Sequence, residues 1–260
     1  QVEVKINGLL DIDVLSEVWK KVVERHDALR TKIFCKGVEN NVQVVFKEID
    51  YELPYIDLTR VPLVKQHDVK DQKKRESMNI GIHNEKLMNV QVFKMREDEH
   101  YFVWTHHHIL LDGWSSSNVL NEIFEGYNAI KMGVELSWQK PTCQFGDYIR
   151  YIRKTNDEEM NKVWSKLLKD VEQPTLSFNK KQSNLSQDNC VLYWEFSHNE
   201  SKELRSLAVK HQTTLNNVLQ LAWALLLKVW SGKDQSVFGI ISSGRTPQLI
   251  NSEKIVGLLI

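Results

Sequence analysis

The sequence predicts a mixed α/β fold (α+β) arranged as two lobes, and three observations carry this prediction. The chain has 260 residues, about the length of two domains. Segments in which apolar and polar residues alternate, as in strands, are interspersed with segments whose apolar residues recur every three or four positions, as in helices. A polar stretch over residues 173–189 separates two such parts. We therefore expect an N-terminal lobe over residues 1–175 and the start of a second lobe over residues 176–260.

The first expected elements are a strand, a helix and two further strands. Apolar and polar residues alternate over residues 2–6, and an Asn-Gly pair then marks a turn. Asp11 or Asp13 can cap the next helix, whose apolar stripe continues to about His26. Strands are then expected over residues 31–34 and 42–49, followed by a Pro-punctuated connection and a charged helix over residues 65–78.

A hairpin and a helix follow. Residues 89–94 and 100–105 are β-rich and flank a charged turn, which predicts that they pair. Asp112-Gly113 forms a turn, and Ser115 or Ser116 can cap the helix after it. Beyond this point the periodicity predicts helices over residues 145–153, 158–169, 199–211 and 216–230, and strands over residues 191–196 and 236–241.

Composition excludes several classes of protein. Thirty-four basic and thirty-four acidic residues leave a net charge of zero, so the chain has no overall electrostatic footprint for nucleic acid or for an anionic membrane. No apolar run is long enough to cross a bilayer. Cys35, Cys143 and Cys190 are widely separated, which favours neither a disulfide framework nor a CxxC motif and fits a cytoplasmic protein.

A run of histidines, His106 to His108, ends the second strand of the expected hairpin. Because side chains alternate along a strand, we expect His106 and His108 to share one face and His107 to point to the other. Three imidazoles that do not converge make a poor tetrahedral zinc site, so we expect no bound metal. A buried strand histidine is often only a core residue, but here an Asp-Gly pair follows at Asp112 and Gly113 before a helix begins.

This arrangement resembles the HHxxxDG signature of condensation domains of nonribosomal peptide synthetases. The signature is spelled HHILLDG at residues 107–113, and four further stretches resemble motifs of the same family in the same order. They are RHDALRT at residues 25–31, FGDY at 145–148, SGR at 243–245 and IVGL at 255–258.

Some positions depart from the family pattern. Asp27 stands in place of the usual Glu, and Ile149 and Tyr151 stand where Ala and Trp are commoner. The family's earliest motif would precede Gln1, and the last motif stops before its Asn. We therefore expect the chain to be a fragment of a complete domain.

The resemblance implies the two-lobed fold of chloramphenicol acetyltransferase and a role for each motif residue. His108 is the candidate catalytic residue, acting as general base or positioning the attacking amine, and His107 packs or orients. Asp112 is expected to form a structural salt bridge with Arg245 from the second lobe, and Gly113 is a candidate to place its N–H near the oxyanion. His106 is assigned no role.

The two residues after Gly113 extend the match. Trp114 and Ser115 give a DGWS form, which resembles the subtype that joins an L-configured donor to an L-amino acid. Both are candidate substrate-facing residues. For Trp114, a purely structural role as a core aromatic at the start of a helix is an equally good interpretation.

The resemblance also implies the partners. Upstream and downstream peptidyl carrier domains would present the substrates on 4'-phosphopantetheine arms, an adenylation domain would belong to the same synthetase, and the domain would bind no cofactor of its own. Three alternatives stay open: an epimerization domain, a CoA-dependent acyltransferase of the same fold, and a non-catalytic docking module.

Overall fold

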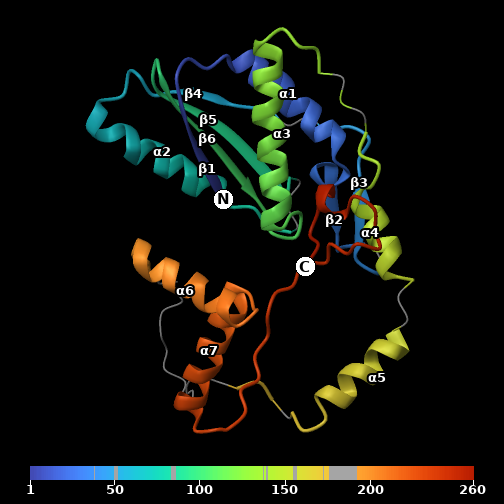
Figure 1. Cartoon of the computed structure of the whole chain (residues 1–260). Helices are drawn as coiled ribbons and strands as arrows, with labels where there is room; N and C mark the ends of the chain where they lie inside the picture. Colours follow the sequence, from blue (N-terminus) through green and yellow to red (C-terminus); the bar gives the residue numbers. More distant parts are fainter. Residues whose placement is uncertain are drawn as a thin grey trace. The chain divides into compact units, whose positions relative to one another are not determined.

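A four-stranded sheet forms the centre of the first of two units in the computed structural model (Figure 1). The structure describes residues 1–260 apart from 38, 50, 51, 83–85, 137, 139, 155, 156, 172 and 176–191. The first unit comprises Gln1–Thr155 together with Ser242–Ile260, and the second comprises Asn156–Ile241. The sheet order is β1 (Val2–Asn7), β6 (Glu99–His106), β5 (Met88–Arg96) and β4 (Tyr55–Asp57).

The pairing of β5 with β6 fixes where the histidine run begins. The two strands form an antiparallel hairpin in which Met88 lies opposite His106. Strand β1 pairs antiparallel with β6, and β4 pairs parallel with β5. Because β6 is hydrogen-bonded on both sides and ends at His106, the loop that follows emerges from the middle of the sheet.

Helices α1 (Ile12–Arg25) and α3 (Gly113–Lys131) pack together over one face of this sheet. Trp19 of α1 meets the rings of Phe102 and Trp104 edge-on, with centroids 6.2 and 5.9 Å apart. Val119 and Ile123 of α3 join the same core. This apolar burial anchors α3, and therefore holds the start of that helix at the end of β6.

Helix α2 (Leu63–Ser77) belongs to the opposite face of the sheet. Phe93 and Val103 alternate with the residues of the first face and pack with Val69 of α2. The buried Lys70 ammonium lies 4.0 Å from the centroid of the Tyr101 ring and 2.5 Å from the Glu3 carboxylate.

A second, smaller sheet and three short helices complete the described part of the first unit. Strands β2 (Thr31–Phe34) and β3 (Val42–Val45) pair antiparallel, β2 follows the 3₁₀ helix η1 (Asp27–Arg30), and α4 spans Phe145–Ile152. The segment from Ser242 to Ile260 contains a second 3₁₀ helix, η2 (Ser252–Lys254), and buries Ile255 and Leu259 with Tyr148.

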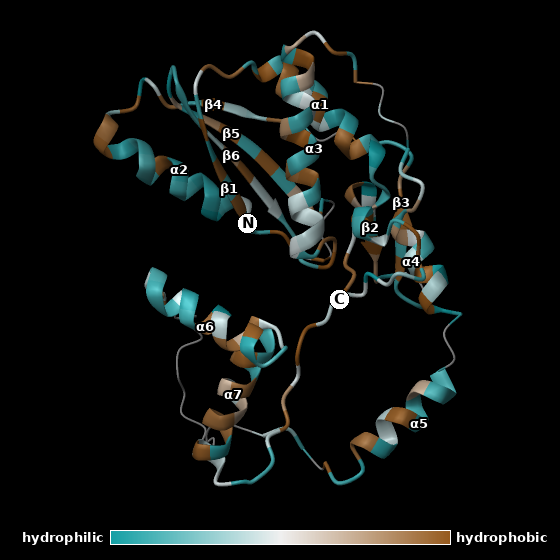
Figure 2. Cartoon of the chain, in the orientation of Figure 1, coloured by the Kyte–Doolittle hydropathy of each residue, from teal (hydrophilic) through white to brown (hydrophobic). Residues whose placement is uncertain are grey.

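The second unit contains three described helices, α5 (Asp157–Leu167), α6 (His198–Lys210) and α7 (Leu215–Ser231). Ser197 and Glu200 form a capping box at the start of α6. Helix α7 is apolar over much of its length, as Figure 2 shows by its brown colour, and Leu221, Leu225 and Val229 are exposed. Within the described ranges, no helix is long and apolar enough to span a bilayer.

The mixed α/β prediction is confirmed, and most elements lie where the sequence places them. Helix α3 is capped by Asp112, which accepts from the Ser115 N–H, so the prediction of a Ser115 or Ser116 cap was wrong. Strand β4 was missed because it is three residues long and depends on its pairing with β5. The second strand of the small sheet ends at Val45, earlier than expected.

Two expected strands do not form. Residues 192–196 and 236–241 are irregular, and residue 191 lies outside the described residues. A strand needs a neighbour that accepts its backbone hydrogen bonds. Val237 instead exchanges bonds with Thr175, whose N–H donates to the Val237 carbonyl over 2.8 Å. Most of the expected polar separator over residues 173–189 also lies outside the described residues, as does Cys190.

Candidate active site

The loop over residues 107–112 joins the end of β6 to the start of α3. The His107 N–H donates to the Leu87 carbonyl over 2.8 Å, and the Leu110 N–H donates back to the His107 carbonyl over 3.0 Å. The chain therefore turns from His107 onward. His107 and His108 lie in this turn and not in the strand, so the expected alternation of faces along His106, His107 and His108 was wrong.

The two motif histidines have different surroundings. Nδ1 of His107 accepts a hydrogen bond from the Ile109 N–H at 3.1 Å, and its ring is half-buried. Because this contact occupies Nδ1, the neutral ring carries its proton on Nε2. The side chain of His108 is exposed and makes no hydrogen bond to another described residue. Of the two, His108 is the imidazole that an incoming molecule can reach.

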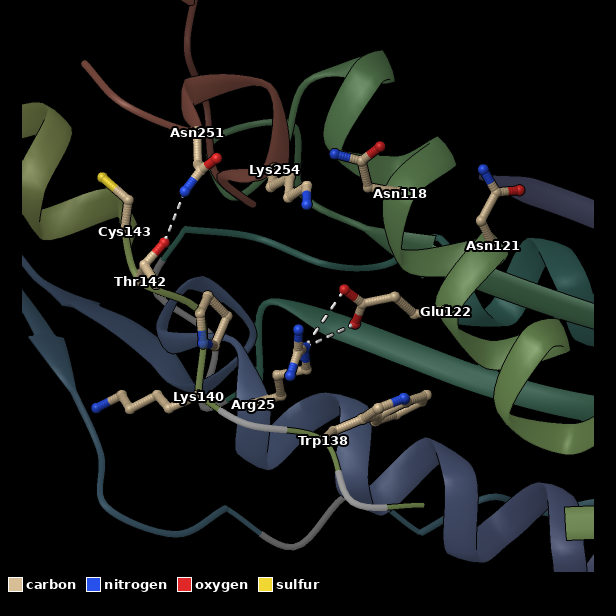
Figure 3. A pocket seen from close by; sticks show the side chains of 11 residues that line it. Arg25, Asn118, Asn121, Glu122, Trp138, Lys140, Thr142, Cys143, Asn251 and Lys254 are labelled. Carbon is tan, nitrogen blue, oxygen red and sulfur yellow. Dashed lines mark hydrogen bonds and ion pairs between the residues drawn. The ribbon is translucent and has the colours of Figure 1, made fainter. Parts of the chain in front are cut away.

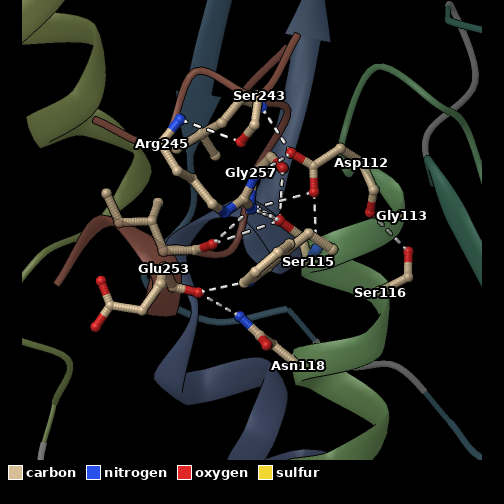
Figure 4. Close-up of polar contacts among 12 residues, drawn as sticks. Asp112, Gly113, Ser115, Ser116, Asn118, Ser243, Arg245, Glu253 and Gly257 are labelled. Carbon is tan, nitrogen blue, oxygen red and sulfur yellow. Dashed lines mark hydrogen bonds and ion pairs between the residues drawn. The ribbon is translucent and has the colours of Figure 1, made fainter. Parts of the chain in front are cut away.

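The Asp112 carboxylate accepts four hydrogen bonds at the centre of the site (Figure 4). It accepts from Nη1 and Nη2 of Arg245 at 2.6 and 3.1 Å, from the Ser115 N–H at 2.7 Å and from the Leu259 N–H at 3.0 Å. Burial opposes ionisation of this carboxyl group, but these hydrogen bonds outweigh it and lower the pKa of Asp112. Asp112 is thus buried and charged, and the hydrogen bonds of its carboxylate hold the loop in place.

Arg245 and Ser115 complete this buried network. Nη2 of Arg245 also donates to Ser115 Oγ at 2.8 Å and to the Ile255 carbonyl at 3.2 Å. Ser115 Oγ in turn donates to the Gly257 carbonyl over 2.7 Å and accepts from the Gly257 N–H over 3.0 Å. The start of α3 is therefore bonded to the C-terminal segment through Ser115, which faces inward.

Trp114 points the other way. Its side chain is 56% exposed, and Nε1 donates to the Glu253 carbonyl over 2.9 Å. The Arg245 guanidinium lies 5.6 Å from the ring centroid, within the range of a cation–π contact. Asn118, one turn later on α3, donates to the same Glu253 carbonyl over 2.8 Å. The exposed face of Trp114 is available beside the loop.

Close packing joins three of the other motifs. A Cβ at Gly244 would overlap the Tyr148 hydroxyl, and a Cβ at Gly257 would overlap the Phe145 ring. The Gly244 N–H also donates to the Leu259 carbonyl over 2.7 Å. The FGDY stretch therefore packs directly against the segment that supplies Arg245.

The RHDALRT stretch has a structural role in this unit. Arg30 donates to the Val23 carbonyl over 3.2 Å and pairs with Asp27 at 2.7 Å. His26 Nε2 lies 2.7 Å from the Glu122 carboxylate on α3. These bonds join the end of α1 to its own loop and to α3.

A pocket of about 530 Å³ lies beside α3, about a turn beyond Trp114 (Figure 3). The ion pair between Arg25 and Glu122, 3.3 Å apart, lies among its lining residues. Lys140, Asn251 and Lys254 line it as well. No sequence motif covers most of these residues, because helices and loops far apart in the sequence supply them.

The arrangement offers an exposed imidazole on a rigidly held loop. Among the residues that the structure describes, no group of three or more His, Cys, Asp or Glu side chains is placed to hold a metal ion. Sequence reasoning missed Leu259 and Gly257 as partners of the loop, because they contribute only backbone groups. It also missed the contact of His106 with Ser116, whose only signal is that both residues can hydrogen-bond.

Comparisons with known proteins agree with this architecture. Bacitracin synthase 1 of Bacillus licheniformis is 30% identical over the whole chain, and tyrocidine synthase 2 of Brevibacillus parabrevis is 28% identical over the whole chain. The chain spans only 5% of the first synthase and 7% of the second.

Solved structures show the same fold. The first condensation domain of the calcium-dependent antibiotic synthetase matches 99% of the chain with a TM-score of 0.75 at 16% identity. The epimerization domain from the third module of tyrocidine synthetase B matches 99% with a TM-score of 0.77 at 19% identity. The chain covers 61% and 60% of these two structures.

The family model named Condensation domain matches residues 1–260, the full length of the chain. The loop with His107, His108 and the buried Asp112 is held by Arg245 and by the backbone of Gly257 and Leu259. The chain therefore belongs to the condensation-domain family.

Proposed function

We propose that the domain to which this chain belongs forms an amide bond within a nonribosomal peptide synthetase. The amine of a downstream carrier-bound aminoacyl group attacks the carbonyl carbon of an upstream carrier-bound thioester. The C–N bond forms, the C–S bond breaks, the amine loses a proton and the upstream pantetheine leaves as a thiol. The observation that carries this proposal is the exposed His108 on a loop whose Asp112 is locked by Arg245.

In this proposal each site residue has one role. The imidazole of His108 accepts a proton from the amine or positions the amine for attack. His107 orients the turn through its bond from the Ile109 N–H. Gly113 is the first residue of α3, so its N–H has no partner within the helix and can face a developing oxyanion.

The remaining residues hold or face the site. Asp112 and Arg245 act structurally, since neither has a free charge to offer. Trp114 is the better candidate to face substrate, because Ser115 is buried and hydrogen-bonded.

The proposal extends to partners. The curated relatives are synthetases many times longer than this chain, which supports upstream and downstream peptidyl carrier domains and an adenylation domain in the same protein. Substrates would arrive on 4'-phosphopantetheine arms of the carrier domains, and the domain itself would hold no cofactor. The reaction would take place in the cytoplasm. The DGWS form supports an L-configured donor.

For the domain organisation, we propose one lobe over residues 1–175 and a second lobe from residue 176 onward.

The test uses the full protein with both carriers loaded. An L-aminoacyl thioester is placed on the upstream carrier and a different amino acid on the downstream carrier, and each carrier is followed by intact mass. We expect the downstream carrier to gain the donor acyl mass, and His108→Ala to lower the rate about a hundred- to ten-thousand-fold if the imidazole is the general base. A smaller loss would assign it to positioning.

Three other outcomes would replace the proposal. Solvent deuterium appearing at the α-carbon of a carrier-bound residue without transfer would indicate epimerization, the activity named for one of the matching folds. Transfer from an acyl-CoA and not from the carrier would indicate a CoA-dependent acyltransferase. No reaction with folded protein and loaded carriers would indicate a docking module.

A further inference from the structure

His106 and Ser116 stand on the two sides of the loop that carries His108. His106 is the last residue of β6, and Ser116 lies in the first turn of α3. Nε2 of His106 lies 3.2 Å from Ser116 Oγ. This contact joins the two ends of the loop directly, so the loop spans a fixed gap.

The other hydrogen bonds of Ser116 limit which group can donate in this contact. Ser116 Oγ donates to the Asp112 carbonyl over 3.1 Å, and the Ser116 N–H donates to the same carbonyl over 3.0 Å. A hydroxyl group has one hydrogen, so Ser116 cannot donate to the Asp112 carbonyl and to His106 at once. When that hydrogen lies on the Asp112 carbonyl, His106 donates to Ser116 Oγ from Nε2.

The surroundings of His106 keep its ring neutral. Its ring packs against Trp104 with centroids 4.8 Å apart. Its Nδ1 is buried and has no partner among the described residues. Burial lowers the pKa of His106 to about 4, which keeps the ring neutral at pH 7. An apolar side chain at this position would leave no buried nitrogen without a partner. The imidazole therefore contributes its hydrogen bond to Ser116, which an apolar side chain could not make.

We propose that His106 is a positioning residue that sets the placement of His108 by holding the first turn of α3 through Ser116. This inference rests on the proposed function, in which His108 is the reacting side chain. Placement matters because an error of about 1 Å in a reacting group can cost about a hundredfold in rate.

The test compares four variants in the full protein with loaded carriers. His106→Leu and Ser116→Ala remove the contact, whereas His106→Gln keeps an N–H donor. Ser117→Ala is the matched control, because it removes a neighbouring α3 hydroxyl that bonds only to the Gly113 carbonyl. The measurements are kcat, the KM for the donor-loaded carrier, and hydrogen–deuterium exchange of the peptide over residues 107–117.

We expect His106→Leu and Ser116→Ala to lower kcat by up to about a hundredfold with an unchanged KM, and to speed exchange in the 107–117 peptide. His106→Gln should recover most of the turnover, and Ser117→Ala should match the wild type. Ser116→Ala keeps the test decisive if His106→Leu does not fold.

The proposal is overturned if Ser116→Ala leaves kcat and exchange unchanged, or if His106→Gln is as impaired as His106→Leu. It is also overturned if KM rises while kcat holds. A wild type that forms no amide would overturn the proposed function instead, and the exchange of the 107–117 peptide would then decide whether His106 holds the loop.

Discussion

Arg245 binds Asp112 through two hydrogen bonds, from Nη1 to Oδ2 at 2.6 Å and from Nη2 to Oδ1 at 3.1 Å. The two residues are 133 positions apart in the sequence. Both side chains are almost completely buried. The paired fork geometry fixes orientation as well as distance. The pair therefore ties the start of α3 to the C-terminal segment, and the His108 loop lies directly before that start.

We expect Arg245→Ala to destabilise the protein by about 3–5 kcal/mol, because it leaves the Asp112 carboxylate buried without its counter-charge. Urea unfolding measures the change. The matched control is Arg150→Ala, which removes an exposed arginine paired with Asp147 on α4 and should cost at most about 1 kcal/mol. Equal effects of the two variants would contradict a structural role for the buried pair.

Asp112→Asn separates the charge of Asp112 from its role as a helix cap. An Asn side chain can still accept from the Ser115 N–H and cap α3, whereas Ala cannot. We expect Asp112→Asn to be more stable than Asp112→Ala by about 1 kcal/mol, with both below the wild type. Thermal or urea unfolding of both variants measures this difference, and identical stabilities would show that the cap contributes nothing.

Gly244→Ala should destabilise the protein by about 1–3 kcal/mol, because the added Cβ overlaps the Tyr148 hydroxyl. Removing that hydroxyl with Tyr148→Phe should recover part of the loss in the double variant. Gly146→Ala is the control on the same packed motif, since its Cβ would meet only Arg150 at 3.8 Å. Urea unfolding that ranks Gly146→Ala as the more damaging change would refute this account of the packing.

Local patterns predicted those elements whose formation depends on nearby residues. The alternation in β5 and β6 and the apolar stripe of α3 are local signals, and both predictions hold. The cap of α3 was misassigned because Asp, like Ser, is a good N-cap, and only the backbone register selects Asp112. Strand β4 depends on parallel pairing with β5, which no window of three residues reveals.

The site likewise contains some features that the sequence predicted and others that it did not. A family resemblance, and not any spacing, pointed to the contact between Asp112 and Arg245. The bonds from the Leu259 and Gly257 N–H groups come from backbone more than 140 positions away, where side-chain identity carries no signal. The alternation expected for the histidine run failed because the Leu110 N–H donates to the His107 carbonyl and closes a turn there.

Glu3 has a stabilising role on the other face of the sheet. Its carboxylate pairs with the buried Lys70 at 2.5 Å and with Lys74. Burial alone would raise the pKa of Glu3, but the two ammonium groups lower it. We expect Glu3→Ala to cost more stability than Lys70→Met, because only the first leaves a buried ammonium without this partner. Urea unfolding that gives the opposite order would contradict this role.

The stability of the protein should fall as the pH drops from about 6.5 towards 4, in part because of His106. The pKa of this ring is lowered to about 4 by burial, whereas an unfolded chain protonates it near 6.5. Between these two pKa values the unfolded state binds a proton on this ring and the folded state does not, so lowering the pH favours unfolding.

Between pH 7.5 and pH 5 we expect this ring to account for about 1–2 kcal/mol. Urea unfolding of the wild type and His106→Gln at both pH values measures it. The variant should lose less stability on acidification, while its remaining loss reflects groups such as His100, whose pKa burial also lowers. The same loss of stability in both proteins would show that His106 is protonated as readily in the folded chain as in the unfolded one, and its bond to Ser116 would then not depend on a neutral ring.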